Sequence, residues 1–195
     1  MVTRIKGGYL YGPEDLGNKD LLVINGKIER IDTAISIPDN LFPKVEMISA
    51  ATKFVFPGFI DQHVHIIGGG DAGPYGRVRE IFVRDIIKAG ITTIVGTLGS
   101  DTISRSLSSL LYKAKVLKRC GFNAFIYTGS LIFPPITLTG SIERDVGLIE
   151  EVIGVKMGLG EPSFPRPDLR EIENLITETR RGALHSHKPA IVRIH

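Results

Sequence analysis

The chain has 195 residues, 43% of them hydrophobic, which is enough for one sizeable core or a modest two-part architecture. Its 24 basic and 21 acidic residues give a dispersed net charge of +3, and no apolar run reaches membrane-spanning length, so we expect neither a nucleic-acid nor a membrane partner. The single cysteine, Cys120, excludes an internal disulfide, and the N-terminus lacks the apolar stretch of a signal peptide. We therefore expect a cytoplasmic protein.

Residues 1–50 consist of short alternating runs separated by turns, which is typical of β-structure. Residues 20–24 and 27–31 flank Asn25-Gly26, a dipeptide that favours the two-residue turn of a β-hairpin. We predict a small β-sandwich module over residues 1–50, packed against the rest of the chain and contributing no catalytic group.

Residues 51–195 alternate between strand-like runs and helical runs of roughly 10 to 20 residues. Ser100, Ser141 and Asp168 are suited to begin helices, and Gly182 to end the last one. This alternation predicts an α/β domain with a parallel sheet, either doubly wound or closed as a barrel. The predicted strands span residues 54–65, 92–97, 124–128, 152–156 and 190–195.

The run His63-Val64-His65 closes the first of these strands. Side chains alternate faces along a strand, so His63 and His65 point the same way at neighbouring heights. Two imidazoles on one face form half of a metal chelate, whereas a lone strand histidine is more often a hydrogen-bonded core residue. The pair therefore predicts a metal site.

Two more candidate ligands, Lys156 and His195, end other predicted strands. Both parallel architectures place their sites at the carboxyl ends of strands, so these side chains and the histidine pair are expected to meet. An ammonium repels a cation, but a deprotonated lysine that has added carbon dioxide supplies a carbamate that can bridge two metals. A lysine paired with a carboxylate is the alternative.

The sequence resembles the metal-dependent amidohydrolase superfamily, and within it the isoaspartyl dipeptidase family. The resemblance rests on several motifs spread over most of the chain: residues 57–65, 65–74, 99–105, 139–141 and 152–156. It implies a (β/α)₈ TIM-type barrel, of which residues 51–195 form the first half. It also implies two zinc ions, or other divalent metals, with His63 and His65 on one, carboxylated Lys156 bridging both, and His195 on the second.

The activity implied is hydrolysis of β-aspartyl dipeptides through a metal-bridging hydroxide, in a protein that is a homo-oligomer when complete. The family places a further histidine ligand and the general-base aspartate on later strands, beyond His195. We therefore expect no certain catalytic residue in this half and no activity from it alone. A partner chain that completes the barrel and a domain cut from a longer parent are the alternatives.

The resemblance is weaker in the substrate pocket. Gly70, Asp71 and Ser100 match substrate-binding positions, but Asp71 replaces a glutamate and Ser100 replaces a threonine. Leu131 and Ser163 fall where the family has an oxyanion-assisting tyrosine and a substrate-binding arginine. Hydrolysis of another linear or cyclic amide is therefore the alternative activity, and a non-catalytic metal-binding fragment is the alternative class.

Overall fold

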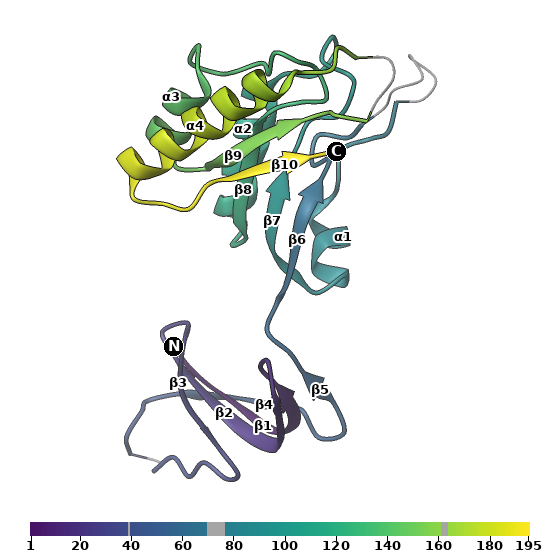
Figure 1. Ribbon diagram of the computed structural model, residues 1–195. Helices are drawn as coiled ribbons and strands as arrows, with labels where there is room; N and C mark the ends of the chain where they lie inside the picture. The colour runs from purple at the N-terminus through teal and green to yellow at the C-terminus, as the bar shows by residue number, and fades with distance from the viewer. Residues whose placement is uncertain (39, 70–76, 161–163) are drawn as a thin grey trace. The chain divides into compact units, whose positions relative to one another are not determined.

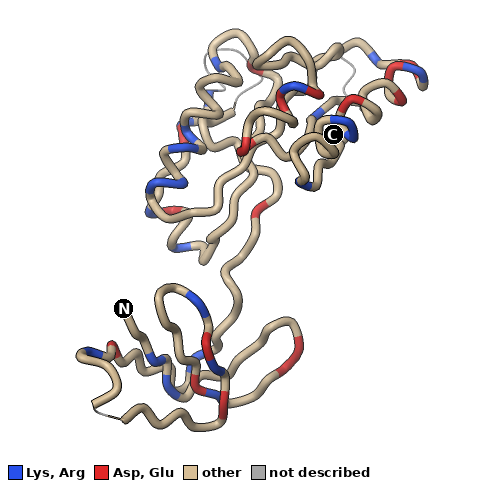
Figure 2. Tube along the Cα trace, turned by 90° about the vertical axis from the view of Figure 1, so that its left-hand side faces the viewer, with Lys and Arg blue, Asp and Glu red and all other residues tan. Residues whose placement is uncertain are grey.

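The computed structural model describes residues 1–38, 40–69, 77–160 and 164–195. They form two compact units, Met1–Gly58 and Phe59–His195, and each is described by itself. Basic and acidic residues are interspersed along both units (Figure 2). None of the described helices is both long and apolar enough to cross a membrane.

The first unit is a mixed five-stranded sheet. The strands β3, β2, β1 and β4 follow in that order, and β5 also pairs with β1. The neighbours β1–β2 and β2–β3 are antiparallel, whereas β4 and β5 run parallel to β1. Asn25 and Gly26 both have positive φ and join β2 to β3, which confirms the predicted hairpin. The bounds are β1 (Val2–Tyr11), β2 (Asp15–Ile24), β3 (Lys27–Asp32), β4 (Val45–Ser49) and β5 (Phe54–Val55).

The prediction of one continuous strand over residues 54–65 was wrong. Phe54 and Val55 pair with Tyr9 and Leu10 in the first unit, and the chain starts a new strand, β6 (Phe59–Val64), in the second. Pro57 separates the two because it has no N–H to give to a ladder.

The second unit contains a parallel sheet with strand order β10-β9-β8-β7-β6. Strands that are consecutive in sequence are neighbours throughout, which is the order of a barrel and not of a doubly wound sheet. The carboxyl ends of these strands lie together at one end of the unit, where the chain also ends (Figure 1). The fold is thus part of a TIM-type barrel, as predicted. Its further elements are β7 (Ile91–Gly96), β8 (Asn123–Gly129), β9 (Val152–Met157), β10 (Ile191–Ile194), α1 (Val83–Lys88), α2 (Leu107–Arg119), α3 (Ile142–Leu148) and α4 (Leu169–Ser186).

Helix boundaries confirm some of the predicted signals and correct others. Ser141 caps α3, and Asp168 forms a capping box with Glu171 at α4. Ser100 does not begin a helix. Asp101 accepts hydrogen bonds from the backbone N–H groups of Ile103 and Ser104, and α2 starts after Ser106.

Gly182 does not end α4, which continues to Ser186. A Cβ at position 182 would lie 2.7 Å from the carbonyl oxygen of Glu143 on α3. The glycine therefore allows α3 and α4 to pack closely.

A buried carboxylate, Asp20, holds the first unit together. It is 4% exposed and accepts hydrogen bonds from Arg4 Nη2 at 2.6 Å, Gly7 N at 2.9 Å and Ile35 N at 3.1 Å. Burial raises the pKa of Asp20, but the hydrogen bonds from Arg4, Ile35 and Gly7 outweigh it, so the pKa lies below its ordinary value.

We expect Asp20→Asn to lower the free energy of unfolding by about 2 kcal/mol at pH 7, because the charge-assisted bonds are lost. A pKa lowered by folding stabilises the protein above the unfolded-state pKa, and this stabilisation is lost as the pH falls through the folded-state pKa. The difference in free energy of unfolding between the wild type and Asp20→Asn, measured by urea denaturation, should therefore become smaller below about pH 4. Exposed Glu29→Gln should change stability by less than about 0.5 kcal/mol, and a gap independent of pH would contradict the prediction.

Candidate metal centre at the strand ends

Three histidine rings gather at the carboxyl ends of β6 and β10. The ring centroids of His63 and His65 are 5.5 Å apart, and those of His63 and His195 are 5.9 Å apart. His63 and His65 share a face because of the period of two along β6, and His195 follows β10 at the other edge of the sheet. The fold therefore brings together three residues that are far apart in sequence.

The orientation of His65 is fixed by its surroundings. Its Nδ1 lies 3.1 Å from the carbonyl oxygen of Thr97, which can only accept, so Nδ1 carries the proton and Nε2 keeps its lone pair. A Cβ at Gly99 would lie 3.2 Å from the His65 ring, so the glycine makes room for it. Burial, and then the charge of Lys156, lowers the pKa of His65 and favours the neutral form that binds metals.

Lys156, at the end of β9, is 1% exposed. Its Nζ donates to the carbonyl oxygen of Leu98 at 2.8 Å and lies 3.4 Å from Nε2 of His63. Burial, and then the charge of Arg193, lowers the pKa of Lys156 to about 8. No carboxylate in the described part of the chain forms an ion pair with it.

The pKa of His63, like that of Lys156, is lowered by burial and by a neighbouring positive charge. Burial, followed by the charge of Lys156, lowers the pKa of His63 to about 4, so its ring is neutral at physiological pH. A neutral imidazole offers one lone pair to a metal. Both His63 and His65 are therefore neutral, as ligation requires, although Nδ1 of His63 accepts a hydrogen bond from Arg193.

The imidazole nitrogens of His63, His65 and His195 are suitable metal ligands, but they do not form a complete coordination site by themselves. Over the described ranges, no group of three or more His, Cys, Asp or Glu side chains is arranged to hold a metal ion. Lys156 is not a ligand as an ammonium, and it becomes an anionic oxygen donor only as a carbamate. A metal would thus depend on modified Lys156 and on donors other than the described residues.

The predicted substrate residues are only partly visible. Gly70, Asp71 and Ser163 lie outside the described residues. Ser100 follows β7 and is half-buried, and Leu131 follows β8 and is 7% exposed. The apolar Leu131 side chain has no hydrogen-bond donor.

The sequence analysis did not identify two arginines that bond to His63 or to the segment after β6. Arg193 donates through Nε to Nδ1 of His63 at 3.3 Å, and its place two residues before His195, on the same face of β10, is the signal that could have revealed it. Arg105 is 6% exposed and donates to the carbonyl oxygens of Ile67 at 2.9 Å and Val78 at 2.7 Å. No sequence pattern indicates that Arg105 bonds to these carbonyl groups.

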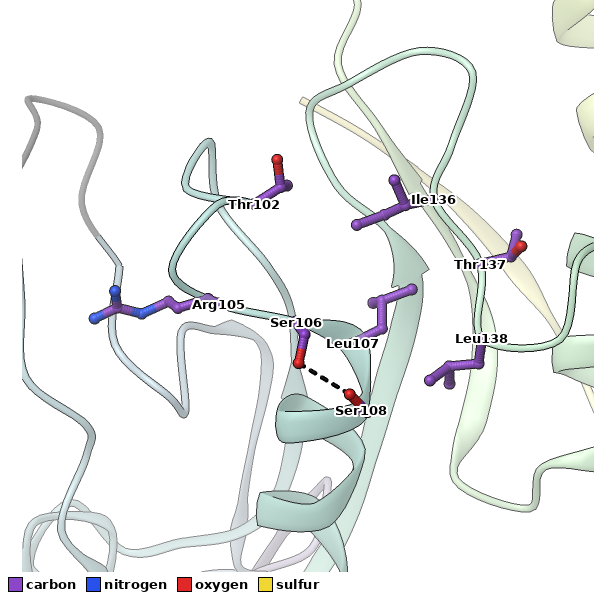
Figure 3. Close-up of a pocket in the computed structure, with 8 residues that line it drawn as sticks. All are labelled: Thr102, Arg105, Ser106, Leu107, Ser108, Ile136, Thr137 and Leu138. Carbon is purple, nitrogen blue, oxygen red and sulfur yellow. Dashed lines mark hydrogen bonds between the residues drawn. The ribbon is translucent and has the colours of Figure 1, made fainter.

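A pocket lies between the segment that precedes α2 and the one that follows β8 (Figure 3). The Oγ atoms of Ser106 and Ser108 on its wall are 2.9 Å apart. The side chain of Arg105 points away from the other labelled residues, toward the segment after β6. None of the predicted site residues lines this pocket, which is formed by Thr102, Arg105, Ser106, Leu107, Ser108, Ile136, Thr137 and Leu138.

Known proteins are similar to this chain over part of their own length. The beta-aspartyl dipeptidase of Fervidobacterium islandicum AW-1 is 40% identical, with a TM-score of 0.93 over 100% of this chain and 53% of its own. Its complex with a beta-Asp-Leu dipeptide gives a TM-score of 0.92, also at 40% identity, over 100% of this chain and 51% of its own. The dihydroorotase of Aquifex aeolicus is 33% identical over 129 residues, which are 65% of this chain and 29% of the enzyme.

No family model matches the chain. The chain spans about half the length of the solved dipeptidase and less of the dihydroorotase. Both relatives are members of the amidohydrolase superfamily, so the comparisons confirm the resemblance that the motifs indicated.

We expect Arg105→Met to lower the free energy of unfolding by about 2 to 4 kcal/mol, because the carbonyl groups of Ile67 and Val78 lose their buried charged donor. Amide exchange at Gly68 and Gly69, which lie between those carbonyls, should accelerate. Denaturant titration and hydrogen-exchange mass spectrometry measure the two effects. Arg84→Met, at a side chain 72% exposed, is the control and should cost less than about 0.5 kcal/mol; equal effects would contradict the role of Arg105.

Proposed function

We propose that this amidohydrolase-like chain is the N-terminal half of a binuclear zinc hydrolase that cleaves β-aspartyl dipeptides. The observation that supports this most is the 40% identity, over the whole of this chain, to a solved beta-aspartyl dipeptidase. The strand-end donors agree with it, because His63, His65, Lys156 and His195 meet at the end of the sheet where barrel enzymes have their sites.

In this proposal His63 and His65 would hold one zinc ion and His195 the second, and Lys156 would be the ligand shared by both, as a carbamate that its neutral amine forms with carbon dioxide on losing a proton. When bound, such a pair of metals lowers the pKa of a bridging water and polarises the scissile carbonyl. Two features of the chain support the assignment of Lys156: its amine is buried without an acidic partner among the described residues, and its pKa of about 8 leaves a neutral fraction able to react.

Backbone carbonyl groups orient two of the proposed ligands, His65 and Lys156. The carbonyl oxygen of Thr97 keeps Nε2 of His65 unprotonated, and the carbonyl oxygen of Leu98 holds the amine of Lys156 beside His63. Asp71, with Gly70 before it, would bind the free amino group of the substrate, and Ser100 would contact the substrate beside it. The general-base aspartate and a further histidine ligand are expected beyond His195.

A second candidate function is hydrolysis of a different amide. The identity to a dihydroorotase over 129 residues favours it, as do Leu131 and Ser163, which lack the donors that a β-aspartyl dipeptidase is expected to place there. The donors on the strands suit either substrate, since both reactions break an amide bond.

Lys156→Met tests the metal centre. The complete protein, prepared with zinc and bicarbonate, should hold two zinc ions per chain and show a carbamate signal in ¹³C-bicarbonate NMR. We expect the variant to lose the signal and at least one zinc, and to lose activity by at least about 100-fold. Lys188→Met is the control, because Lys188 is also partly buried but donates to the carbonyl oxygen of Ile149 at the other end of the strands. A wild-type protein that holds two zinc ions without a carbamate would refute the assignment.

Asp71→Asn tests the substrate. If Asp71 binds the ammonium of a β-aspartyl dipeptide, the loss of one charge-assisted bond should lower kcat/KM by about 10- to 150-fold. A panel of β-aspartyl dipeptides and neutral cyclic amides, assayed with the complete protein, measures this. Turnover of the cyclic amides alone, unaffected by Asp71→Asn, would retain an amidohydrolase and exclude the dipeptidase.

A further inference from the structure

Arg193 lies among the proposed metal ligands although no ligand role suits it. It is on β10, two residues before His195 and directly opposite Lys156 in the register of β9 and β10. Its Nε donates to Nδ1 of His63 at 3.3 Å. The guanidinium is thus beside the histidine cluster at the end of the sheet.

The charges around this guanidinium are not balanced by the described residues. Lys156 and Arg193 add two cationic groups to three imidazoles, and no carboxylate of the described part of the chain forms an ion pair with either. A guanidinium has five N–H donors, and in the same part of the chain Arg193 uses one, toward His63. Most of its hydrogen-bonding capacity is therefore free for an anion.

The bond to His63 is itself incompatible with a metal on that histidine. A neutral imidazole has one donor and one acceptor nitrogen, and here Nδ1 accepts from Arg193. If Nε2, which faces Lys156, gives its lone pair to a metal, Nδ1 carries the proton and can no longer accept. A metal on His63 would thus remove the one acceptor that Arg193 has among the described residues.

We propose that Arg193 binds a carboxylate of the substrate and thereby selects acidic amides. This inference rests on the proposed function and deepens it, because it names the substrate group that the chain itself can recognise. A guanidinium forms two parallel hydrogen bonds with a carboxylate, a geometry that an ammonium does not provide. A β-aspartyl dipeptide presents two carboxylates, one on the aspartyl residue and one at its C-terminus.

The test uses the complete zinc-loaded protein with Arg193→Gln and Arg193→Lys. The substrates are β-Asp-Leu and two analogues, each with one of its carboxylates converted to a carboxamide. For Arg193→Gln we expect kcat/KM on β-Asp-Leu to fall about 10- to 100-fold, mainly through KM, and to fall less than about 3-fold on the analogue that lacks the bound carboxylate. Arg193→Lys should be intermediate, since it keeps the charge without the paired donors.

Zinc content and ligand binding provide readouts apart from activity. Arg193→Gln should keep the zinc content of the wild type, and calorimetry should show L-aspartate binding at least about 10-fold more weakly. Arg170→Gln, an exposed arginine on α4, should change neither. Equal losses on all three substrates, or loss of zinc from Arg193→Gln, would show a structural role and overturn the proposal.

The proposed function can fail separately. If the wild-type protein hydrolyses none of these dipeptides, the dipeptidase assignment is wrong, and aspartate binding alone then decides the role of Arg193. Weaker aspartate binding by Arg193→Gln than by the wild type would uphold carboxylate recognition. Identical binding by the two proteins, or none by either, would overturn it.

Discussion

The amine of Lys156 is almost fully withdrawn from solvent at the end of β9, and no acidic side chain of the described residues accompanies it. Desolvation of an unpaired ammonium is costly, so the pKa of Lys156 falls and the neutral amine becomes accessible near physiological pH. The neighbouring His63 experiences the same desolvation and stays neutral. Among the described residues, the strand ends therefore lack negative charge, which a carbamate on Lys156 or a substrate carboxylate would supply.

Parallel strand geometry explains why a site with these residues could be predicted at all. The period of two places His63 and His65 on one face from sequence alone. Adding Lys156 and His195 required the further rule that parallel sheets gather functional groups at the carboxyl ends of their strands, and the observed order β10-β9-β8-β7-β6 satisfies that rule. Arg193 obeys the same alternation but was missed, because a lone arginine in a strand usually extends into solvent.

Other features depend on long-range contacts that local patterns do not encode. The break between β5 and β6 follows from the pairing of Phe54 with Tyr9, a residue 45 positions earlier. Gly182 looked like a helix end, yet its missing side chain serves the contact with α3. Arg105 reaches the carbonyl groups of Ile67 and Val78, and neither partner carries a distinctive side chain that would indicate the bond. Helix caps such as Ser141 and Asp168 can be predicted because their backbone partners are close in sequence, whereas the backbone partners of Arg105 are distant.

The candidate metal ligands and the segments between the strands differ in how they are held, and this difference bears on the choice of substrate. The candidate metal ligands lie on or directly after strands, whereas Arg105 bonds the backbone of two residues that follow β6, Ile67 and Val78. The loop after β8 is held in a similar way: buried Asp145 accepts from Leu138 N at 2.8 Å and from Thr139 N at 2.8 Å. Loops can change sequence while such anchors keep their ends in place, because several of the bonds that the anchors make are to backbone groups. A dihydroorotase and a beta-aspartyl dipeptidase can therefore both resemble this chain, and substrate choice should depend on the side chains between the anchors more than on the strand-end donors.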